Sequence, residues 1–244
     1  MDRPDNSGLP DNIVMGEVDY SNLPYIISLF VLILSLLILF LWRKTKTART
    51  DLLVVGPSDS GKTYLYSQLL YSEDKETFTS IAANTGIYNG EHGQIKFVDI
   101  PGNERLRGKF LDQYKYLAKG VIYVVDSLTL QRDIRDVADY LYTILADSAF
   151  SATPILILCN KQDETMAKGS GVIQNLLEKE LNLIRTTRSN RLQSVDNSTN
   201  REEVYLGKQG KDFSFSHLAQ NIQFAECSAK DREFKSLIKW IESL

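Results

Sequence analysis

One eight-residue stretch, GPSDSGKT at positions 56–63, constrains the fold of this chain more than any other feature. Its two glycines and the pair Lys62–Thr63 have the spacing GxxxxGK[ST], which is that of a phosphate-binding loop. Such a loop needs a strand before it and a helix after it, because backbone N–H groups and the helix amino terminus surround the phosphate. A short apolar strand is predicted over 51–55 and a helix over 62–70, so the required context is present.

Beyond this loop, strand-like and helix-like segments alternate, which is typical of a mostly parallel α/β sheet. Two continuous apolar runs, 120–126 and 154–160, predict strands that are buried on both faces. Residues 134–146 have apolar residues at helical spacing, so a helix is expected there. The remaining predicted elements are a hairpin with strands 85–89 and 94–100, a last strand over 221–226 and a helix over 231–244. The predicted architecture is a six-stranded α/β sheet with one antiparallel edge strand and helices on both faces.

One segment departs from this alternation. Residues 185–215 are polar and have poor periodicity in their middle. Loops of this length are unusual in compact domains, and the low hydrophobicity predicts a flexible surface excursion over about 189–201. The alternative interpretation is a tolerated insertion without function, because surface insertions cost little.

An apolar run precedes the globular part. Residues 24–42 are 19 residues with no charge and two serines, and about 20 apolar residues cross the hydrocarbon core of a bilayer as a helix. A signal peptide would have a shorter apolar core, an earlier start and a small-residue cleavage site. A buried helix would show a polar face, which this run lacks. A transmembrane helix over 24–42 is therefore predicted.

The two flanks of this run differ in charge. Residues 1–23 contain five acidic residues and one arginine, whereas residues 43–50 contain four basic residues. Because basic flanks stay in the cytosol, the short amino-terminal segment is expected to cross the membrane. Residues 43–50 are then a basic juxtamembrane linker to a cytosolic domain over 51–244.

The composition argues against nucleic-acid binding, a disulfide and a zinc site. A formal charge of −3 argues against a nucleic-acid-binding protein, which usually carries a basic surplus. The two cysteines, Cys159 and Cys227, belong to the predicted cytosolic part, where thiols stay reduced. A disulfide is therefore not expected, and two cysteines alone do not make a zinc site.

Each part of the 56–63 loop has a task if a nucleotide binds. Glycines permit the backbone conformations that turn successive N–H groups toward a phosphate. Lys62 can reach the β- and γ-phosphates, and the Thr63 hydroxyl can bind Mg²⁺. The loop residues predicted to bind nucleotide are Gly56, Pro57, Ser58, Asp59, Ser60, Gly61, Lys62 and Thr63. The loop alone does not separate ATP from GTP.

The sequence NKQD at 160–163 makes that separation. It follows a buried strand, at the edge where open α/β sheets bind ligands. The Asp163 carboxylate can accept hydrogen bonds from the N1–H and the 2-amino group of guanine, whereas adenine has no 2-amino donor. Asn160 can bridge to the phosphate-binding loop, and the stem of Lys161 can lie along the base. Just past the last strand, the further predicted base-binding residues are Ser228, Ala229, whose N–H can meet guanine O6, and Lys230.

The sequence DIPG ends another strand and predicts the phosphate and metal contacts. Asp99 can hold Mg²⁺ through water, and the Gly102 N–H can meet the γ-phosphate. Loss of that phosphate would release both contacts, so the following segment is expected to be a switch. The other switch needs a threonine, for which Thr79 is preferred over Thr85 and Thr77. The predicted magnesium ligands are Thr63, Thr79 and Asp99, the last through water.

Taken in order, the glycine loop, DxxG, NKxD and SAK motifs resemble those of Ras-type small GTPases over residues 51–244. GVIYVVDS, NKQD and the arginine spacing of PGNERLR are most similar to the ADP-ribosylation-factor branch. Members of that branch use an amphipathic amino-terminal helix and a lipid, but this chain has a predicted transmembrane anchor and no Met-Gly start. That combination, with DSGKT and TSI, resembles the β subunits of the signal recognition particle receptor.

The resemblance implies a P-loop GTPase fold, with GTP or GDP and Mg²⁺ as ligands. It implies a single-pass protein of the endoplasmic reticulum membrane with a lumenal amino terminus and a cytosolic GTPase domain. In its GTP-bound state, the switch face would recruit the amino-terminal domain of the receptor α subunit for co-translational targeting. The signal recognition particle, ribosome and translocon would be indirect partners, lipid would contact residues 24–42, and no direct nucleic-acid binding is expected.

Asn103 departs from the pattern of these enzymes, which place a glutamine after the DxxG glycine to orient the attacking water. Asparagine is one methylene shorter. Gly102 and Asn103 are the predicted catalytic positions, but the shorter Asn103 side chain is not expected to orient the water well, so tight GTP binding with slow hydrolysis is expected. The alternatives are a rapidly cycling GTPase that recruits coat or tether proteins, and a structural anchor whose nucleotide completes the fold.

Three aromatic residues follow the second switch and are predicted interface residues: Phe110, Tyr114 and Tyr116. Core packing of the adjacent helix is the alternative, because buried aromatic residues serve both roles.

Overall fold

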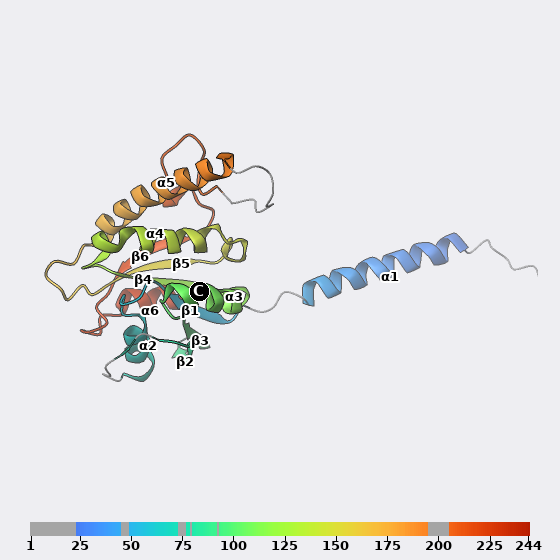
Figure 1. The fold of residues 1–244 in the computed structure, drawn as a ribbon. Helices are drawn as coiled ribbons and strands as arrows, with labels where there is room; N and C mark the ends of the chain where they lie inside the picture. Colours follow the sequence, from blue (N-terminus) through green and yellow to red (C-terminus); the bar gives the residue numbers. More distant parts are fainter. Residues whose placement is uncertain (1–22, 45–48, 73–76, 79, 92, 195–204) are drawn as a thin grey trace, which may run out of the picture. The chain divides into compact units, whose positions relative to one another are not determined.

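The computed structural model describes residues 23–44, 49–72, 77–78, 80–91, 93–194 and 205–244. The chain divides into two compact units, 1–47 and 48–244. The expected lumenal segment, apart from Leu23, and residues 45–48 of the linker thus lie outside the described residues (Figure 1).

The described residues of the first unit form helix α1 (Leu23–Lys44). The side chains of Leu23, Ile26 and residues 39–44 lie outside the description. The large apolar side chains described in α1 are exposed, from 44% for Leu34 to 74% for Tyr25. Among the residues that the structure describes, no helix is long and apolar enough to cross a membrane.

The second unit contains a six-stranded sheet in the order β2-β3-β1-β4-β5-β6 (Figure 1). Only the pairing of β2 with β3 is antiparallel, which confirms the predicted sheet with one antiparallel edge strand. The strands are β1 (Asp51–Val55), β2 (Asn84–Gly90), β3 (Gly93–Asp99), β4 (Ala118–Asp126), β5 (Ile155–Asn160) and β6 (Ile222–Glu226). Because β1, β3, β4, β5 and β6 are parallel, their carboxyl ends share one edge of the sheet, and the following loops meet there.

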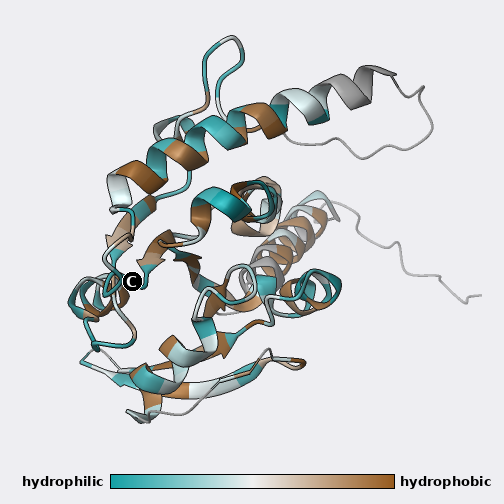
Figure 2. Ribbon diagram, turned by 60° about the vertical axis from the view of Figure 1, so that its left-hand side comes forward, coloured by the Kyte–Doolittle hydropathy of each residue, from teal (hydrophilic) through white to brown (hydrophobic). Residues whose placement is uncertain are grey.

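Helices cover both faces of this sheet. The side chains of β1 alternate between the faces: Leu53 packs in the core below α3, α4 and α5, whereas Leu52 packs in the core below α2 and α6. Figure 2 shows apolar residues gathered along the central strands. The helices are α2 (Lys62–Tyr71), α3 (Glu104–Tyr114), α4 (Leu130–Ala146), α5 (Ser170–Ser194) and α6 (Lys235–Glu242), with short 3₁₀ turns η2 (Lys115–Leu117), η3 (Ser148–Phe150) and η4 (Phe215–His217). The two cysteines are buried and unpaired, as expected.

The described parts of the polar segment 185–215 have more regular structure than its composition indicates. Helix α5 continues to Ser194, so the first residues of the expected excursion are helical, and the rest of it falls outside the described residues. Residues 205–215, here called the strap, pack on α5. Arg185 is 4% exposed and donates hydrogen bonds to the carbonyls of Leu206 and Lys211.

Two more α5 side chains extend this contact. The Asn182 Oδ1 atom accepts from Phe213 N at 3.2 Å, and the Glu178 Oε1 atom accepts from Phe215 N at 3.0 Å. With Arg185, these residues lie at positions i, i+4 and i+7 of the helix and therefore form one stripe. The described strap residues pair with no strand, so the α5 stripe supplies partners to backbone groups of Leu206, Lys211, Phe213 and Phe215.

The three predicted interface aromatics do not form one surface. Phe110 and Tyr114 are half-buried and pack against the core between the sheet and helices α3, α4 and α5. Tyr116 is 65% exposed, but it lies in η2, just before the amino end of β4. That edge of the sheet is opposite the phosphate-binding loop, so Tyr116 is not beside the expected switches.

Candidate functional site

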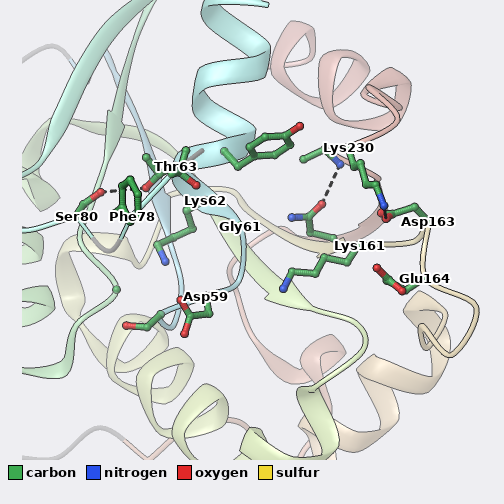
Figure 3. A pocket seen from close by; sticks show the side chains of 16 residues that line it. Asp59, Gly61, Lys62, Thr63, Phe78, Ser80, Lys161, Asp163, Glu164 and Lys230 are labelled. Carbon is green, nitrogen blue, oxygen red and sulfur yellow. Dashed lines mark hydrogen bonds and ion pairs between the residues drawn. The ribbon is translucent and has the colours of Figure 1, made fainter. Parts of the chain in front are cut away.

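A cavity of about 670 Å³ lies at the carboxyl edge of the sheet (Figure 3). The loop after β1, the start of α2, and the loops after β3, β5 and β6 all contribute to its wall. Among the predicted site residues, the ones that line the cavity are Ser58, Asp59, Gly61, Lys62, Thr63, Gly102, Asn160, Lys161, Asp163, Ala229 and Lys230. The fold thus brings together motifs that are up to 172 positions apart in the sequence.

The glycines of the loop have the geometry that the sequence predicts. Gly56 has φ +145°, and a Cβ atom there would overlap the carbonyl of Val124. Gly61 has φ +85°, and a Cβ atom there would be 2.5 Å from the Asn160 side chain. Both positions therefore require glycine for two reasons. Each has a backbone angle that favours glycine, and each is closely approached, Gly56 by β4 and Gly61 by the NKQD loop.

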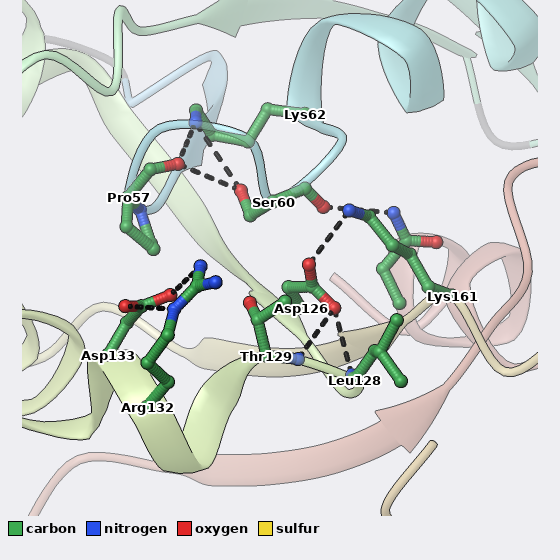
Figure 4. Close-up of polar contacts among 10 residues, drawn as sticks. Pro57, Ser60, Lys62, Asp126, Leu128, Thr129, Arg132, Asp133 and Lys161 are labelled. Atoms are coloured by element: carbon green, nitrogen blue, oxygen red, sulfur yellow. Dashed lines mark hydrogen bonds and ion pairs between the residues drawn. The ribbon is translucent and has the colours of Figure 1, made fainter. Parts of the chain in front are cut away.

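Lys62 is buried at the start of α2 and is 5% exposed. Its Nζ atom donates to the Pro57 carbonyl at 2.6 Å and lies 3.4 Å from Ser60 Oγ (Figure 4). Burial lowers the pKa of Lys62 to about 8, although the charges of Asp99 and Asp59 act in the opposite direction. An anionic ligand in the cavity would supply the counter-charge that this ammonium group now lacks.

Asp99 is fully buried at the end of β3. Its Oδ2 atom accepts from Thr63 Oγ1 at 2.8 Å and from Asn84 Nδ2 at 3.0 Å, whereas Oδ1 has no partner among the described residues. Burial raises the pKa of this carboxyl despite those two hydrogen bonds. An orphaned carboxylate oxygen beside a threonine hydroxyl fits a hard cation such as Mg²⁺.

The described residues hold no cluster of three or more His, Cys, Asp or Glu that could bind a metal by itself. Mg²⁺ usually takes one or two protein groups and completes its shell with phosphates and water. Thr63 and Asp99 are the residues that would hold the ion here.

The threonine of the first switch is not located. Thr79 lies outside the described residues, so its predicted role is untested by the structure. Thr77 lines the cavity, whereas Thr85 pairs with Val98 inside the β2–β3 ladder. Sequence reasoning missed Ser80, whose Oγ atom is 3.1 Å from Thr63 Oγ1. A serine near a switch threonine carries no signal that could have distinguished it.

The opposite end of the cavity is built from the NKQD and SAK loops. Asn160 Nδ2 donates to the Ser60 carbonyl at 3.0 Å, and Asn160 Oδ1 accepts from Ala229 N at 3.1 Å. Ser228 Oγ donates to Asp163 Oδ1 at 2.8 Å. Burial acts to raise the pKa of Asp163, but the hydrogen bond from Ser228 and the nearby Lys230 ammonium lower it overall. Asp163 is therefore an ionised acceptor at neutral pH.

Lys161 also lines this end, in an unusual backbone conformation with φ +68°. Its Nζ atom donates to Asp126 Oδ2 at 2.8 Å (Figure 4). Sequence reasoning did not single out Asp126, although this residue ends a buried strand at the ligand-binding edge and could have been found on that ground.

Asn103 does not line the cavity, whereas Gly102 does. The Asn103 side chain is exposed and accepts from Arg105 N at 3.0 Å, as the amino-terminal cap of α3. Asparagine is one of the residues preferred for this capping role. Its amide is thus engaged in holding the helix.

Comparisons with known proteins agree with this arrangement. The protein-family model described as signal recognition particle receptor beta subunit matches residues 47–222. The signal recognition particle receptor subunit beta of Rattus norvegicus is 41% identical over 238 residues, which cover 91% of this chain and 88% of the relative. The human protein of the same name is 38% identical over 242 residues, which cover 94% of this chain and 89% of the human protein.

Solved structures give the same result. The structure of the mammalian SRP receptor matches with a TM-score of 0.71 and 42% identity, covering 79% of this chain and 98% of that one. The SRb-GTP/SRX complex from Chaetomium thermophilum matches with a TM-score of 0.62 over 81% and 99% of the two chains, and at 21% identity it shows the fold alone. This chain belongs to the signal recognition particle receptor β subunit family.

Proposed function

We propose that this chain is a membrane-anchored subunit of the signal recognition particle receptor that binds GTP and, in that state, recruits the receptor α subunit. The observation that carries the proposal is the base end of the cavity. There, an ionised Asp163 and the backbone N–H of Ala229 lie beside Asn160, which is hydrogen-bonded to the phosphate-binding loop. The Asp163 carboxylate complements the N1–H and 2-amino groups of guanine, and the Ala229 N–H, which donates to Asn160 Oδ1 in the ligand-free protein, would donate to guanine O6 instead.

At the phosphate end, the residues of this chain have three tasks. Lys62 and the backbone N–H groups of residues 58–63 bind the phosphates. Thr63 and Asp99 hold Mg²⁺, which neutralises phosphate charge when it is bound. Gly102 lines the cavity and offers its N–H to the γ-phosphate. Lys62 must leave the Pro57 carbonyl for this arrangement to form.

The γ-phosphate would order the segments around Thr79 and after Gly102, and the ordered surface would bind the amino-terminal domain of the α subunit. The Chaetomium thermophilum complex supports a partner that joins a GTP-bound β subunit of this fold. A rapidly cycling GTPase that recruits coat or tether proteins is the competing function. The capping role of Asn103 favours the slower alternative, because its amide is already engaged.

The proposed location is the endoplasmic reticulum membrane, with residues 24–42 as a single-pass anchor, the amino terminus in the lumen and the GTPase domain in the cytosol. The uncharged run, its helical backbone and its basic carboxyl flank support this arrangement. Resistance of the full chain to alkaline extraction from microsomes tests the anchor. The sequon at Asn197 tests the orientation, since a glycan there would contradict it.

Nucleotide binding is tested with the full chain in detergent, using fluorescent GTP and ATP analogues. We expect a preference for GTP of about 100-fold or more, because a site built to hydrogen-bond one base leaves its polar groups unpaired with another. Equal affinities would contradict the proposal. Capture of the α subunit amino-terminal domain should then be stronger with GTP-loaded than with GDP-loaded chain, and equal capture would contradict the switch.

A further inference from the structure

Asp126 occupies the carboxyl end of β4, directly beside the end of β5. In the parallel pairing of these strands, Asp126 is in register with Asn160, so the next residue of the NKQD loop, Lys161, projects beside the Asp126 carboxylate. Asp126 is 8% exposed and does not line the main cavity, whereas Lys161 does. Asp126 therefore reaches the cavity only through another side chain.

The two oxygens of Asp126 serve two different elements (Figure 4). Oδ1 accepts from Leu128 N at 2.8 Å and from Thr129 N at 3.3 Å, which fixes the turn that leads into α4. Oδ2 accepts from Lys161 Nζ at 2.8 Å. The same carboxylate thus joins the start of α4 to the base end of the cavity.

Lys161 has two reasons to need such a partner. Its φ of +68° is a conformation that residues with a Cβ atom adopt rarely, so the loop must be held in place by its contacts. Its long side chain has much rotamer freedom to lose when it is fixed against a ligand. A lysine that is already fixed in the ligand-free protein avoids most of that loss on binding.

We propose that Asp126 is a positioning residue for the nucleotide site: it holds Lys161 across the base end of the cavity before a nucleotide arrives and slows nucleotide release afterwards. The inference rests on the proposed function, because it concerns the same cavity. Asp126 itself does not contact the nucleotide in this proposal. The choice of base stays with Asp163, which Asp126 does not touch.

Asp126→Asn is the informative variant, because the amide oxygen still accepts from Leu128 N while the charge that holds Lys161 is lost. Dissociation of fluorescent GDP from the full chain in detergent should be about tenfold faster, the effect of one charge-assisted hydrogen bond. The ratio of affinities for GDP and xanthosine diphosphate should not change. The melting temperature of the ligand-free chain should change little. Asp126→Glu, which restores the charge, should recover part of the slow dissociation.

A double-mutant cycle with Lys161→Met separates positioning from a general effect on α4. If Asp126 acts through Lys161, Asp126→Asn adds nothing in the Lys161→Met background. Asp139→Asn is the matched control. Asp139 is a carboxylate on α4 that pairs with Arg188 at 2.7 Å and does not line the cavity. This variant should leave dissociation unchanged.

Two results would overturn the inference alone: unchanged dissociation in Asp126→Asn, or the same acceleration with and without Lys161. Failure of the unmodified chain to bind any guanine nucleotide would overturn the proposed function as well, so the two failures are distinguishable.

Discussion

The two ends of the cavity differ in how completely their polar and charged side chains are paired within the protein. At the base end, the side chains already hold one another: Asn160 is bonded to Ser60 and Ala229, and Asp163 to Ser228. At the phosphate end, the charged groups have substitute partners or none. Lys62 donates to a carbonyl of its own loop, and one oxygen of Asp99 has no partner among the described residues.

This difference indicates that one end of the cavity recognises the base and the other end changes conformation when phosphate and Mg²⁺ bind. A preformed base end selects guanine with little rearrangement, because its groups are held in place by the protein and only the Ala229 N–H must exchange Asn160 Oδ1 for guanine O6. A phosphate end with a buried, incompletely paired lysine and aspartate gains most of its counter-charge from the ligand. Phosphate number and Mg²⁺ should therefore change the conformation of the site, whereas the base should not.

The largest effect is expected from Asp163→Asn, which exchanges an acceptor for a donor at the preformed end. Affinity for GTP should fall by about 10³-fold, and xanthosine triphosphate, whose 2-oxo group needs a donor, should become the preferred ligand. Competition binding with both nucleotides measures this. Asp231→Asn, at an exposed carboxylate nearby, is the control. Unaltered GTP affinity would show that the base end is not where guanine is read.

A smaller effect is expected from Asp99→Asn at the phosphate end. The tightening of nucleotide binding by Mg²⁺ should fall by about tenfold to 100-fold, because a charged ligand of the ion is lost. Ligand-free stability should not fall, since the variant removes a buried charge that lacks full pairing.

Asp51→Asn is the contrast for this experiment. Asp51 is 2% exposed but is paired with Lys96 at 3.2 Å, at the other edge of the sheet. It should lower the melting temperature and leave the Mg²⁺ dependence intact. A drop in stability for Asp99→Asn equal to that for Asp51→Asn would mean that the phosphate end is as complete as the base end.

Lys62 gives a pH test of the same contrast. Its pKa in the ligand-free protein is lowered to about 8 by burial, and a bound phosphate should raise it. Binding of GDP at pH 8 should therefore take up about half a proton, and affinity should decrease as the pH rises through this value. Titration calorimetry in buffers of different ionisation enthalpy measures the uptake. Lys62→Arg, which stays charged, should show none, and zero uptake by the unmodified chain would contradict the assignment.

The smallest effect is expected from Asn103→Ala. Loss of the α3 cap should lower the free energy of unfolding by about 1 kcal/mol. Single-turnover GTP hydrolysis should stay near the slow intrinsic scale of about 10⁻⁴ per second and change by less than about twofold. Gly108→Ala, on the same helix with open space around it, should instead stabilise by about 0.5–1 kcal/mol. A large fall in hydrolysis for Asn103→Ala would make this residue catalytic after all.

Much of the fold and site could be predicted because the signals are local. The glycine loop and the continuous apolar runs of β4 and β5 each carry their own pattern, and the carboxyl edge of a parallel sheet brings their ends together. Asn84 was missed because its role depends on its register with Asp99 on the neighbouring strand. Asp126 could have been found from its place at the end of a buried strand, but its pairing with Lys161 depends on the register of β4 with β5.

The prediction for Tyr116 did not allow for the length of α3. Eleven helical residues cover about 16 Å, so the helix that starts beside Gly102 ends at the opposite edge of the sheet. The extension of α5 was missed for another reason. The arginines and leucine of 185–194 are good helix formers, but the strap carbonyls that Arg185 binds lie more than 20 residues further along the chain.

The stripe of Glu178, Asn182 and Arg185 that holds the strap makes the domain divisible. A single backbone cut between residues 195 and 204 would leave β1 to α5 on one fragment and the strap, β6 and α6 on the other. The stripe and the β5–β6 pairing would still connect the two pieces. Each piece carries half of the base end, Asn160 and Asp163 on the first and Ser228 and Ala229 on the second. Guanine nucleotide should then stabilise the association of the two fragments, because neither fragment presents the whole base end alone. Nucleotide binding would in turn show that the fragments have associated.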